Sequence, residues 1–239
     1  MNKMIRENTE EYMKELKAWL AETADCELEE MDVFFTRRLE GYEEHMAVWE
    51  KAYQRFAQLI PDGCEEILDL GCGTGLELGE IWKRNPELSV TGVDLCPAML
   101  EKLVTQYGDK PFRAVCEDYF RYDMGEERWE GIISFESLHH FLPEKKQKLY
   151  AKVYQGLKKQ GVFLIGDYIA CCQEEETILR ETYLEKRKKF SQKIPEDTFV
   201  HFDIPLTLEH EKELLEKAGF SRICVADCID GATLLVAEK

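Results

Sequence analysis

Short hydrophobic runs alternate with stretches of helical periodicity along most of this 239-residue chain. The hydrophobic runs predict strands at 65–70, 89–94, 112–116, 130–135, 161–167, 221–227 and 232–237. The periodic stretches predict helices near 76–84, 97–107, 143–158 and 207–218. This alternation is typical of a mostly parallel sheet with helices on both faces.

The last two predicted strands are separated only by Asp230-Gly231, a tight-turn dipeptide. They should therefore form a hairpin, with the seventh strand antiparallel to its neighbour. The pattern as a whole predicts an α/β, Rossmann-like fold with a seven-stranded, mostly parallel sheet and an antiparallel last strand.

The N-terminal part and one later segment fall outside this alternation. Amphipathic helices are predicted at about 4–22 and 43–59, and the second ends at the turn Pro61-Asp-Gly63. We therefore expect a helical extension at 1–60 and the α/β domain at 61–239. The segment 170–205, with a charged helix and an irregular stretch, is expected to be an insertion over the carboxyl edge of the sheet, where such folds bind ligands.

A glycine-rich loop follows the first predicted strand. The sequence Asp69-Leu-Gly-Cys-Gly-Thr-Gly75 leads from that strand into a helix. Glycines there permit positive φ angles and let the backbone approach a ligand closely. A dinucleotide-binding fingerprint would place its third glycine one position later, where this chain has Leu76.

Acidic residues also follow the next two strands. Asp94 ends the second strand, 19 positions after Gly75, and suits a bidentate contact with ribose hydroxyls. It could equally cap the following helix, and both roles can hold together. Asp118 follows the third strand and could accept a hydrogen bond from an exocyclic amine, with Tyr119 against a purine face.

These segments, over about residues 64–170, resemble the motifs of class I S-adenosylmethionine-dependent methyltransferases. The resemblance implies S-adenosyl-L-methionine as cofactor and S-adenosyl-L-homocysteine as product. It implies that the cofactor is bound by Asp69, Gly71, Cys72, Gly73, Gly75, Asp94, Leu95, Met99, Asp118, Tyr119, Ser134 and Phe135. The N-terminal aromatic residues resemble the lid that small-molecule methyltransferases place over the cofactor.

The fourth strand ends in a segment that contains His139 and His140. In the family this strand end borders the transferred methyl group, so either imidazole is a candidate general base. Alternatively, the pair supports the turn into the next helix, which begins near Pro143. The acceptor pocket is expected among Tyr42, His45, His140, Tyr168 and the 170–205 insertion.

The formal net charge of −17 disfavours a nucleic-acid partner, since such proteins need clustered Lys and Arg. The apolar runs are too short to span a membrane, and the first 30 residues do not resemble a secretory signal, so a cytoplasmic protein is expected. The nine cysteines include no Cys-x-x-Cys pair and the histidines no His-x-x-x-His pair, so no metal site is expected. The adjacent pair Cys171-Cys172 is either incidental or a thiolate site for a metalloid.

The leading hypothesis is in-line methyl transfer to a small-molecule acceptor. One alternative is an enzyme of the same fold that uses carboxy-S-adenosylmethionine in a tRNA pathway, which would need a basic residue such as Arg38 or Arg113 near the sulfonium. Another is a regulatory protein that binds the cofactor without turnover. Leu76 disfavours a nucleotide-dependent oxidoreductase. The amphipathic N-terminal helix could also pack on a second copy and form a homodimer.

Overall fold

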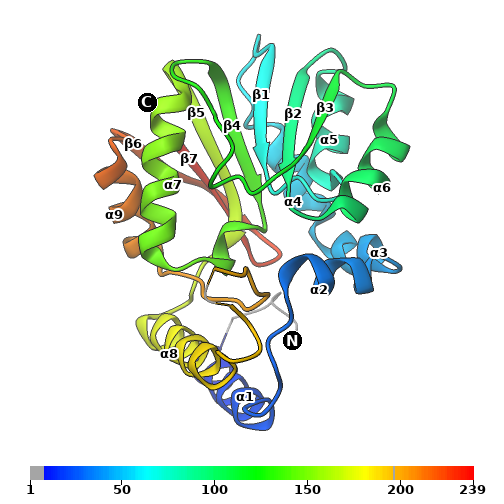
Figure 1. The fold of residues 1–239 in the computed structure, drawn as a ribbon. Coiled ribbons are helices and arrows are strands. Elements are labelled where there is room, and N and C mark those ends of the chain that lie inside the picture. Colours follow the sequence, from blue (N-terminus) through cyan, green and yellow to red (C-terminus); the bar gives the residue numbers. More distant parts are fainter. Residues whose placement is uncertain (1–7, 196) are drawn as a thin grey trace.

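The computed structural model describes residues 8–195 and 197–239. Seven strands form one sheet in the order β3-β2-β1-β4-β5-β7-β6 (Figure 1). Their bounds are β1 Glu66–Leu70, β2 Ser89–Asp94, β3 Phe112–Cys116, β4 Trp129–Phe135, β5 Leu157–Tyr168, β6 Arg222–Ile229 and β7 Ala232–Glu238. Each predicted strand is present, and β5 is longer than expected.

The first five strands run parallel, whereas β7 pairs antiparallel with both β5 and β6. The turn between β6 and β7 consists of Asp230 and Gly231, which both have positive φ angles of 51° and 89°. That geometry matches the twist of a two-residue hairpin. The predicted fold class is therefore confirmed.

Helices cover both faces of the sheet and bury its hydrophobic side chains. One face packs against α4 (Glu50–Ala57), α5 (Leu76–Arg84) and α6 (Pro97–Tyr107), with Phe56, Ile81 and Leu103 fully buried. The other packs against α7 (Pro143–Gly156) and α9 (Leu208–Ala218), through residues such as Tyr150 and Leu215. The predicted helix 43–59 is divided into α3 (Tyr42–Met46), the short 3-10 helix η1 (Ala47–Trp49) and α4.

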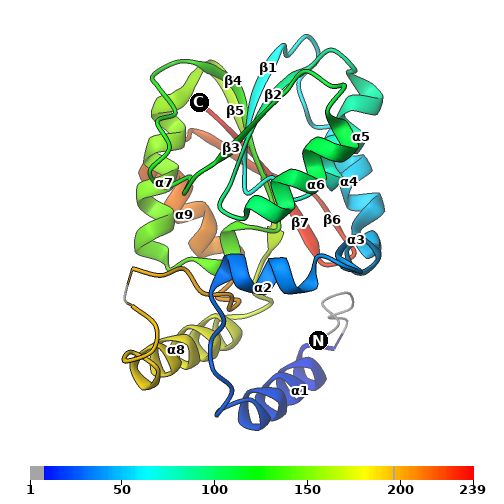
Figure 2. The same ribbon diagram turned by 45° about the vertical axis from the view of Figure 1, so that its right-hand side comes forward.

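Two helices pack together beyond the carboxyl end of the sheet (Figures 1 and 2). They are α1 (Thr9–Glu22) and α8 (Gln173–Lys189), and their small core includes Leu16, Leu179 and Phe202. The Nζ atom of Lys186 donates to the carbonyls of Thr23 and Cys26, at 2.5 and 2.9 Å, and so joins α8 to the end of α1. The predicted start of the first helix, residues 4–7, lies outside the described residues.

One further helix, α2 (Met31–Arg38), crosses the carboxyl ends of the central strands, between the α1–α8 pair and the sheet (Figure 2). The 3-10 helix η2 (Leu138–His140) follows β4 at the same edge. Both elements therefore lie where open α/β sheets bind ligands. Within the described residues, no helix combines the length and the apolar character that a membrane span needs.

Candidate active site

The loop between β1 and α5 exposes its backbone because its glycines have left-handed conformations. Gly71, Gly73 and Gly75 have φ angles of 79°, 50° and 75°. A Cβ atom on Gly71 would lie 2.3 Å from the Oγ atom of Ser137. No side chain can therefore stand at Gly71 without moving its neighbours, and the bare peptide faces the space above the sheet.

The carboxylate of Asp94, at the tip of β2, is bound to this loop. One oxygen accepts from the backbone N–H of Gly73 at 2.9 Å, and the other accepts from that of Cys96 at 2.8 Å. Burial raises the pKa of Asp94 above its usual value, against the effect of these hydrogen bonds. Because each carboxylate oxygen has two lone pairs, Asp94 can accept further hydrogen bonds from a ligand.

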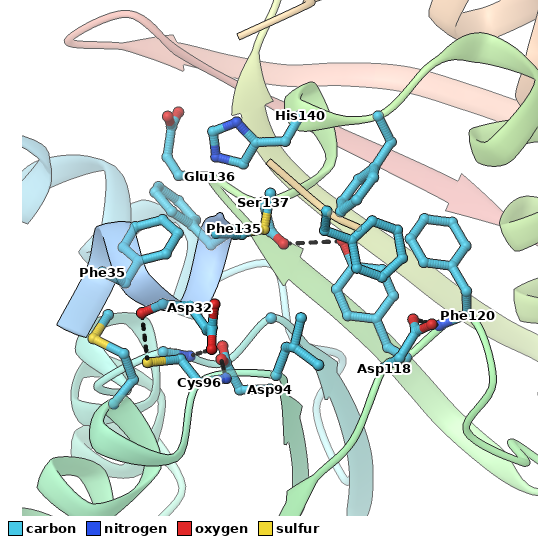
Figure 3. A pocket seen from close by; sticks show the side chains of 18 of the residues that line it. Asp32, Phe35, Asp94, Cys96, Asp118, Phe120, Phe135, Glu136, Ser137 and His140 are labelled. Atoms are coloured by element: carbon cyan, nitrogen blue, oxygen red, sulfur yellow. Dashed lines mark hydrogen bonds between the residues drawn. The ribbon is translucent and has the colours of Figure 1, made fainter. Parts of the chain in front are cut away.

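The loop and Asp94 form one wall of an open cavity, and about 660 Å³ of empty space, part of it continuous with solvent, lies between its lining residues (Figure 3). The cavity extends past the ends of β2, β3 and β4 and is covered by α2 and α3. Its lining includes the predicted site residues Tyr42, Gly71, Gly73, Asp94, Leu95, Met99, Asp118, Tyr119, Phe135 and His140.

Tyr42 reaches the cavity from α3, above the glycine loop. Its hydroxyl would lie 4.0 Å from a Cβ atom placed on Gly73. Burial, followed by the nearby carboxylates of Glu77 and Asp94, raises the pKa of Tyr42. The phenol therefore stays protonated and is available as a hydrogen-bond donor.

Other predicted cofactor residues lie behind the cavity wall. Asp69 and Cys72 are buried beneath the loop, and Gly75 precedes the first turn of α5. The Oγ atom of Ser134 donates to the carbonyl of Leu70 at 2.8 Å and so joins β4 to β1. These residues shape the loop and the strand ends, but they do not line the cavity.

Two predicted acceptor-pocket residues also lie elsewhere. His45 is exposed on α3. Tyr168, at the end of β5, is buried beyond the cavity, where its hydroxyl lies 2.8 Å from that of Tyr12 and donates to Glu175. Among the four residues expected around the acceptor, Tyr42 and His140 line the cavity, whereas His45 and Tyr168 do not.

Beneath the loop, Asp69 faces a second buried carboxyl group, that of Glu77 on α5. Burial, reinforced by Glu77, raises the pKa of Asp69 well above its usual value. Burial also raises the pKa of Glu77 from 4.5 to about 7. The pair therefore holds at least one proton at neutral pH.

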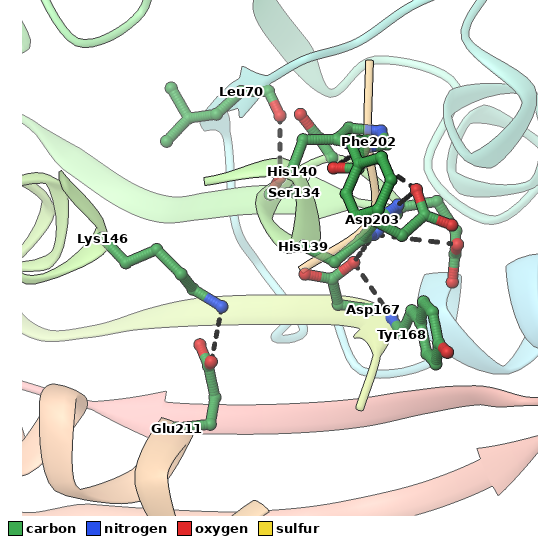
Figure 4. Close-up of polar contacts among 12 residues, drawn as sticks. Leu70, Ser134, His139, His140, Lys146, Asp167, Tyr168, Phe202, Asp203 and Glu211 are labelled. Atoms are coloured by element: carbon green, nitrogen blue, oxygen red, sulfur yellow. Dashed lines mark hydrogen bonds and ion pairs between the residues drawn. The ribbon is translucent and has the colours of Figure 1, made fainter. Parts of the chain in front are cut away.

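The wall opposite Asp94 carries two polar side chains, Glu136 and His140 (Figure 3). The Nδ1 atom of His140 lies 3.2 Å from a carboxylate oxygen of Asp203. His139 is buried behind the wall, with Nδ1 2.5 Å from Asp167 and Nε2 3.5 Å from Asp203 (Figure 4). His140 is therefore the one of the two predicted imidazoles that lines the cavity.

Several lining residues were not predicted as site residues. Asp32 comes from α2, Ser137 follows β4, and the others are Met31, Cys96, Phe141 and Phe199. A local signal existed for Ser137, which stands in the same strand-end segment as the two histidines. Phe199 and Asp203 belong to an irregular segment with no periodic pattern, so no local signal indicated them.

The sheet order, the bare glycine loop and the strand-end acids are the features expected of a class I S-adenosylmethionine-dependent methyltransferase. Comparison with known families agrees, because residues 67–161 match the family described as a methyltransferase domain. This part of the chain is therefore a methyltransferase domain, and the chain has the fold of an S-adenosylmethionine-dependent methyltransferase, as the sequence predicts.

Two curated relatives differ in the reaction that they are named for. A carboxy-S-adenosyl-L-methionine synthase of Nautilia profundicola is 26% identical over 168 residues, which are 66% of this chain and 70% of the relative. A malonyl-[acyl-carrier protein] O-methyltransferase of Anoxybacillus flavithermus is 28% identical over 134 residues, 56% of this chain and 51% of the relative. The chain thus matches about half the length of the second relative.

Solved structures support the fold. A S-adenosylmethionine-dependent methyltransferase of Archaeoglobus fulgidus superposes with a TM-score of 0.59 at 18% identity, over 83% of this chain and 100% of that chain. Human N-acetylserotonin methyltransferase in complex with S-adenosylmethionine superposes with a TM-score of 0.55 at 16% identity, over 83% of this chain and 59% of that chain.

Proposed function

We propose that this protein transfers a methyl group from S-adenosylmethionine to a small-molecule acceptor. The proposal rests on one observation: the wall expected to bind the cofactor and the wall that carries the candidate general base face the same cavity. The glycine loop and Asp94 form one wall, and Glu136 and His140 form the other. The helices α2 and α3 cover this space, which favours an acceptor that enters whole over a long polymer.

The residues present fit the cofactor. The bare peptide at Gly71 and Gly73 accommodates the amino acid and ribose portion, and the Asp94 carboxylate accepts hydrogen bonds from the ribose hydroxyls. Asp118 and Tyr119, with Leu95 and Met99, form a polar and apolar cleft for the adenine. When bound, S-adenosylmethionine supplies an electrophilic methyl group on a sulfonium cation, and the acidic wall suits that charge.

The chain's own contribution to the reaction is alignment and proton removal. Phe35, Tyr42 and Phe135 provide an apolar surface that orients the acceptor and excludes water, and orientation supplies much of the rate gain in such displacements. His140, held against Asp203, is placed to take a proton from the attacking group. His139 is a positioning residue behind it, fixed by Asp167.

The carboxy-S-adenosylmethionine alternative would require a cation beside the sulfonium. Arg38 does not line the cavity: it lies over the ring of Phe34 and pairs with Glu29 at 2.9 Å. Arg113 is exposed in the middle of β3. The acidic groups that do line the cavity favour the unmodified, more cationic cofactor.

Methyl transfer to an unidentified acceptor can be tested with S-adenosylmethionine that carries an isotopic label in its methyl group. A cell extract would be divided into fractions below and above about 1 kDa and incubated with the enzyme. We expect label in the small-molecule fraction, and incorporation only into protein or RNA would refute the proposal. A regulatory protein would bind S-adenosylhomocysteine but label neither fraction.

The competing cofactor is tested by calorimetry. S-adenosylhomocysteine and S-adenosylmethionine should bind at micromolar concentrations, and carboxy-S-adenosylmethionine should bind more weakly because its added carboxylate meets Asp94, Asp118 and Glu136. Tighter binding of the carboxylated compound would favour the alternative.

A further inference from the structure

A cluster of metal-binding side chains lies at the end of β4, opposite the glycine loop. It consists of His139 and His140 from η2 and Asp203 from the segment before α9 (Figure 4). One carboxylate oxygen of Asp203 lies 3.5 Å from Nε2 of His139 and 3.2 Å from Nδ1 of His140. The three ligand atoms all lie within 4.8 Å of one another.

We propose that His139, His140 and Asp203 bind a divalent transition-metal ion. Bonds of about 2.0–2.1 Å place neighbouring ligand atoms of one metal ion about 2.9–3.4 Å apart. The two imidazole-to-carboxylate separations are close to that range. Two imidazoles with one carboxylate suit ions such as Zn²⁺, Fe²⁺, Co²⁺ and Mn²⁺.

The surroundings of His139 match those of a metal ligand. Its Nδ1 atom lies 2.5 Å from Asp167, and this contact directs Nε2 towards Asp203. Metal-bound imidazoles commonly donate their second N–H to a carboxylate in this way. The same oxygen of Asp167 accepts from the backbone N–H of Tyr168 at 3.0 Å, which fixes the carboxylate.

The site adjoins the cavity, since His140 lines it together with Glu136. Three protein ligands leave coordination positions for another molecule, as in catalytic rather than structural metal sites. The acceptor would then be a compound with an oxygen or nitrogen donor that binds the ion directly, and the ion, in place of the His140 imidazole, would promote loss of its proton. This last step rests on the proposed methyl transfer, whereas metal binding itself does not.

Sequence spacing gave no indication of this site because the ligands come from distant segments. His139 and His140 are adjacent and therefore form no helical His-x-x-x-His pair. Asp203 is more than sixty positions further along the chain. The fold brings it to the histidines through a backbone hydrogen bond, in which the N–H of Ile204 donates to the carbonyl of His139 at 2.8 Å.

The test is metal binding by the full chain after treatment with a chelator. Co²⁺ would be titrated and followed by its visible absorption, and Mn²⁺ would be titrated by calorimetry, both without S-adenosylmethionine. We expect one equivalent of each ion to bind. Asp203→Asn and His140→Gln should each weaken the affinity more than tenfold, and Asp167→Asn about 10- to 100-fold.

Matched controls distinguish this site from others on the chain. His210→Gln removes an imidazole that pairs with Glu176 outside the cluster, and it should leave the affinity unchanged. The double variant Cys171→Ser/Cys172→Ser should also bind normally. Circular dichroism would confirm that each variant is folded, and Asp203→Asn and His140→Gln provide two independent tests.

The proposal is overturned if no equivalent of either ion binds, if the cysteine variant abolishes binding, or if both ligand variants bind as the parent does. Binding of S-adenosylhomocysteine, measured separately, reports on the methyltransferase site. Failure of one proposal is therefore distinguishable from failure of the other.

Discussion

The carboxylate of Asp94 accepts a hydrogen bond from the backbone N–H of Gly73, with 2.9 Å between oxygen and nitrogen. This contact joins the tip of β2 to the loop that follows β1. The acid expected to hold the ribose therefore also fixes the loop expected to hold the rest of the cofactor, and the two roles depend on one side chain.

Asp94→Asn should weaken S-adenosylhomocysteine binding by about 10- to 100-fold, because hydrogen bonds to a charged group contribute about 1.5–3 kcal/mol. Isothermal titration calorimetry measures the effect. Asp62→Asn is the control, since that side chain is fully exposed beyond α4. An unchanged affinity in Asp94→Asn would mean that the ribose lies elsewhere.

Gly71→Ala should weaken the same binding at least about tenfold. The added Cβ would collide with Ser137, and a left-handed alanine costs about 1–3 kcal/mol. Gly63→Ala is a matched control, because Gly63 has a similar φ of 80° with open space around it. Both variants should lose stability, but only Gly71→Ala should lose affinity. Equal affinities of the two variants would contradict the proposal that the cofactor binds against the backbone of Gly71.

The buried carboxyl pair beneath the loop predicts a pH-dependent stability. The folded-state pKa of Glu77, about 7, lies above its unfolded value of 4.5. The contribution of Glu77 to the free energy of unfolding is therefore fully present below pH 4.5 and is lost as the pH rises towards 7. Glu77→Gln should therefore gain about 3 kcal/mol relative to the parent between pH 4.5 and 8. Urea unfolding at pH 4.5 and pH 8 measures this difference.

The exposed Glu87→Gln is the control for that series, and its effect should be the same at both pH values. If Glu77→Gln changes stability equally at the two pH values, the buried pair is not protonated as described.

Removing one partner of the buried ion pair between α7 and α9 should lower the stability of the fold. Lys146 lies 2.5 Å from Glu211, and both side chains are buried (Figure 4). Tyr150 also donates to Glu211. Lys146→Met leaves the carboxylate buried without its cation and should cost about 3–5 kcal/mol. The double variant Lys146→Met/Glu211→Gln should recover more than half of that loss in thermal unfolding. A double variant less stable than Lys146→Met would contradict this account.

The sequence predicted the sheet and the cavity wall formed by the glycine loop and Asp94, because both depend on local patterns. Asp94 and Asp118 end strands, and the carboxyl ends of neighbouring parallel strands meet at one edge. The glycines near Gly73 are likewise a local signature. The opposite wall depends on side-chain direction and on long-range packing. His45 turns outward, Tyr168 lies beyond the cavity, and the irregular chain around Asp203 takes its position from the helices that it contacts.

The position of β7 has a consequence for the order in which the chain folds. The last strand in sequence is not at the edge of the sheet but lies between β5 and β6. During synthesis β6 emerges first, yet among the described residues the strand that pairs with it is β7. The part of the cavity expected to bind the cofactor is built from β1 to β4 and can therefore assemble during translation. The half of the sheet beyond β5 must wait until residues 232–238 have left the exit tunnel.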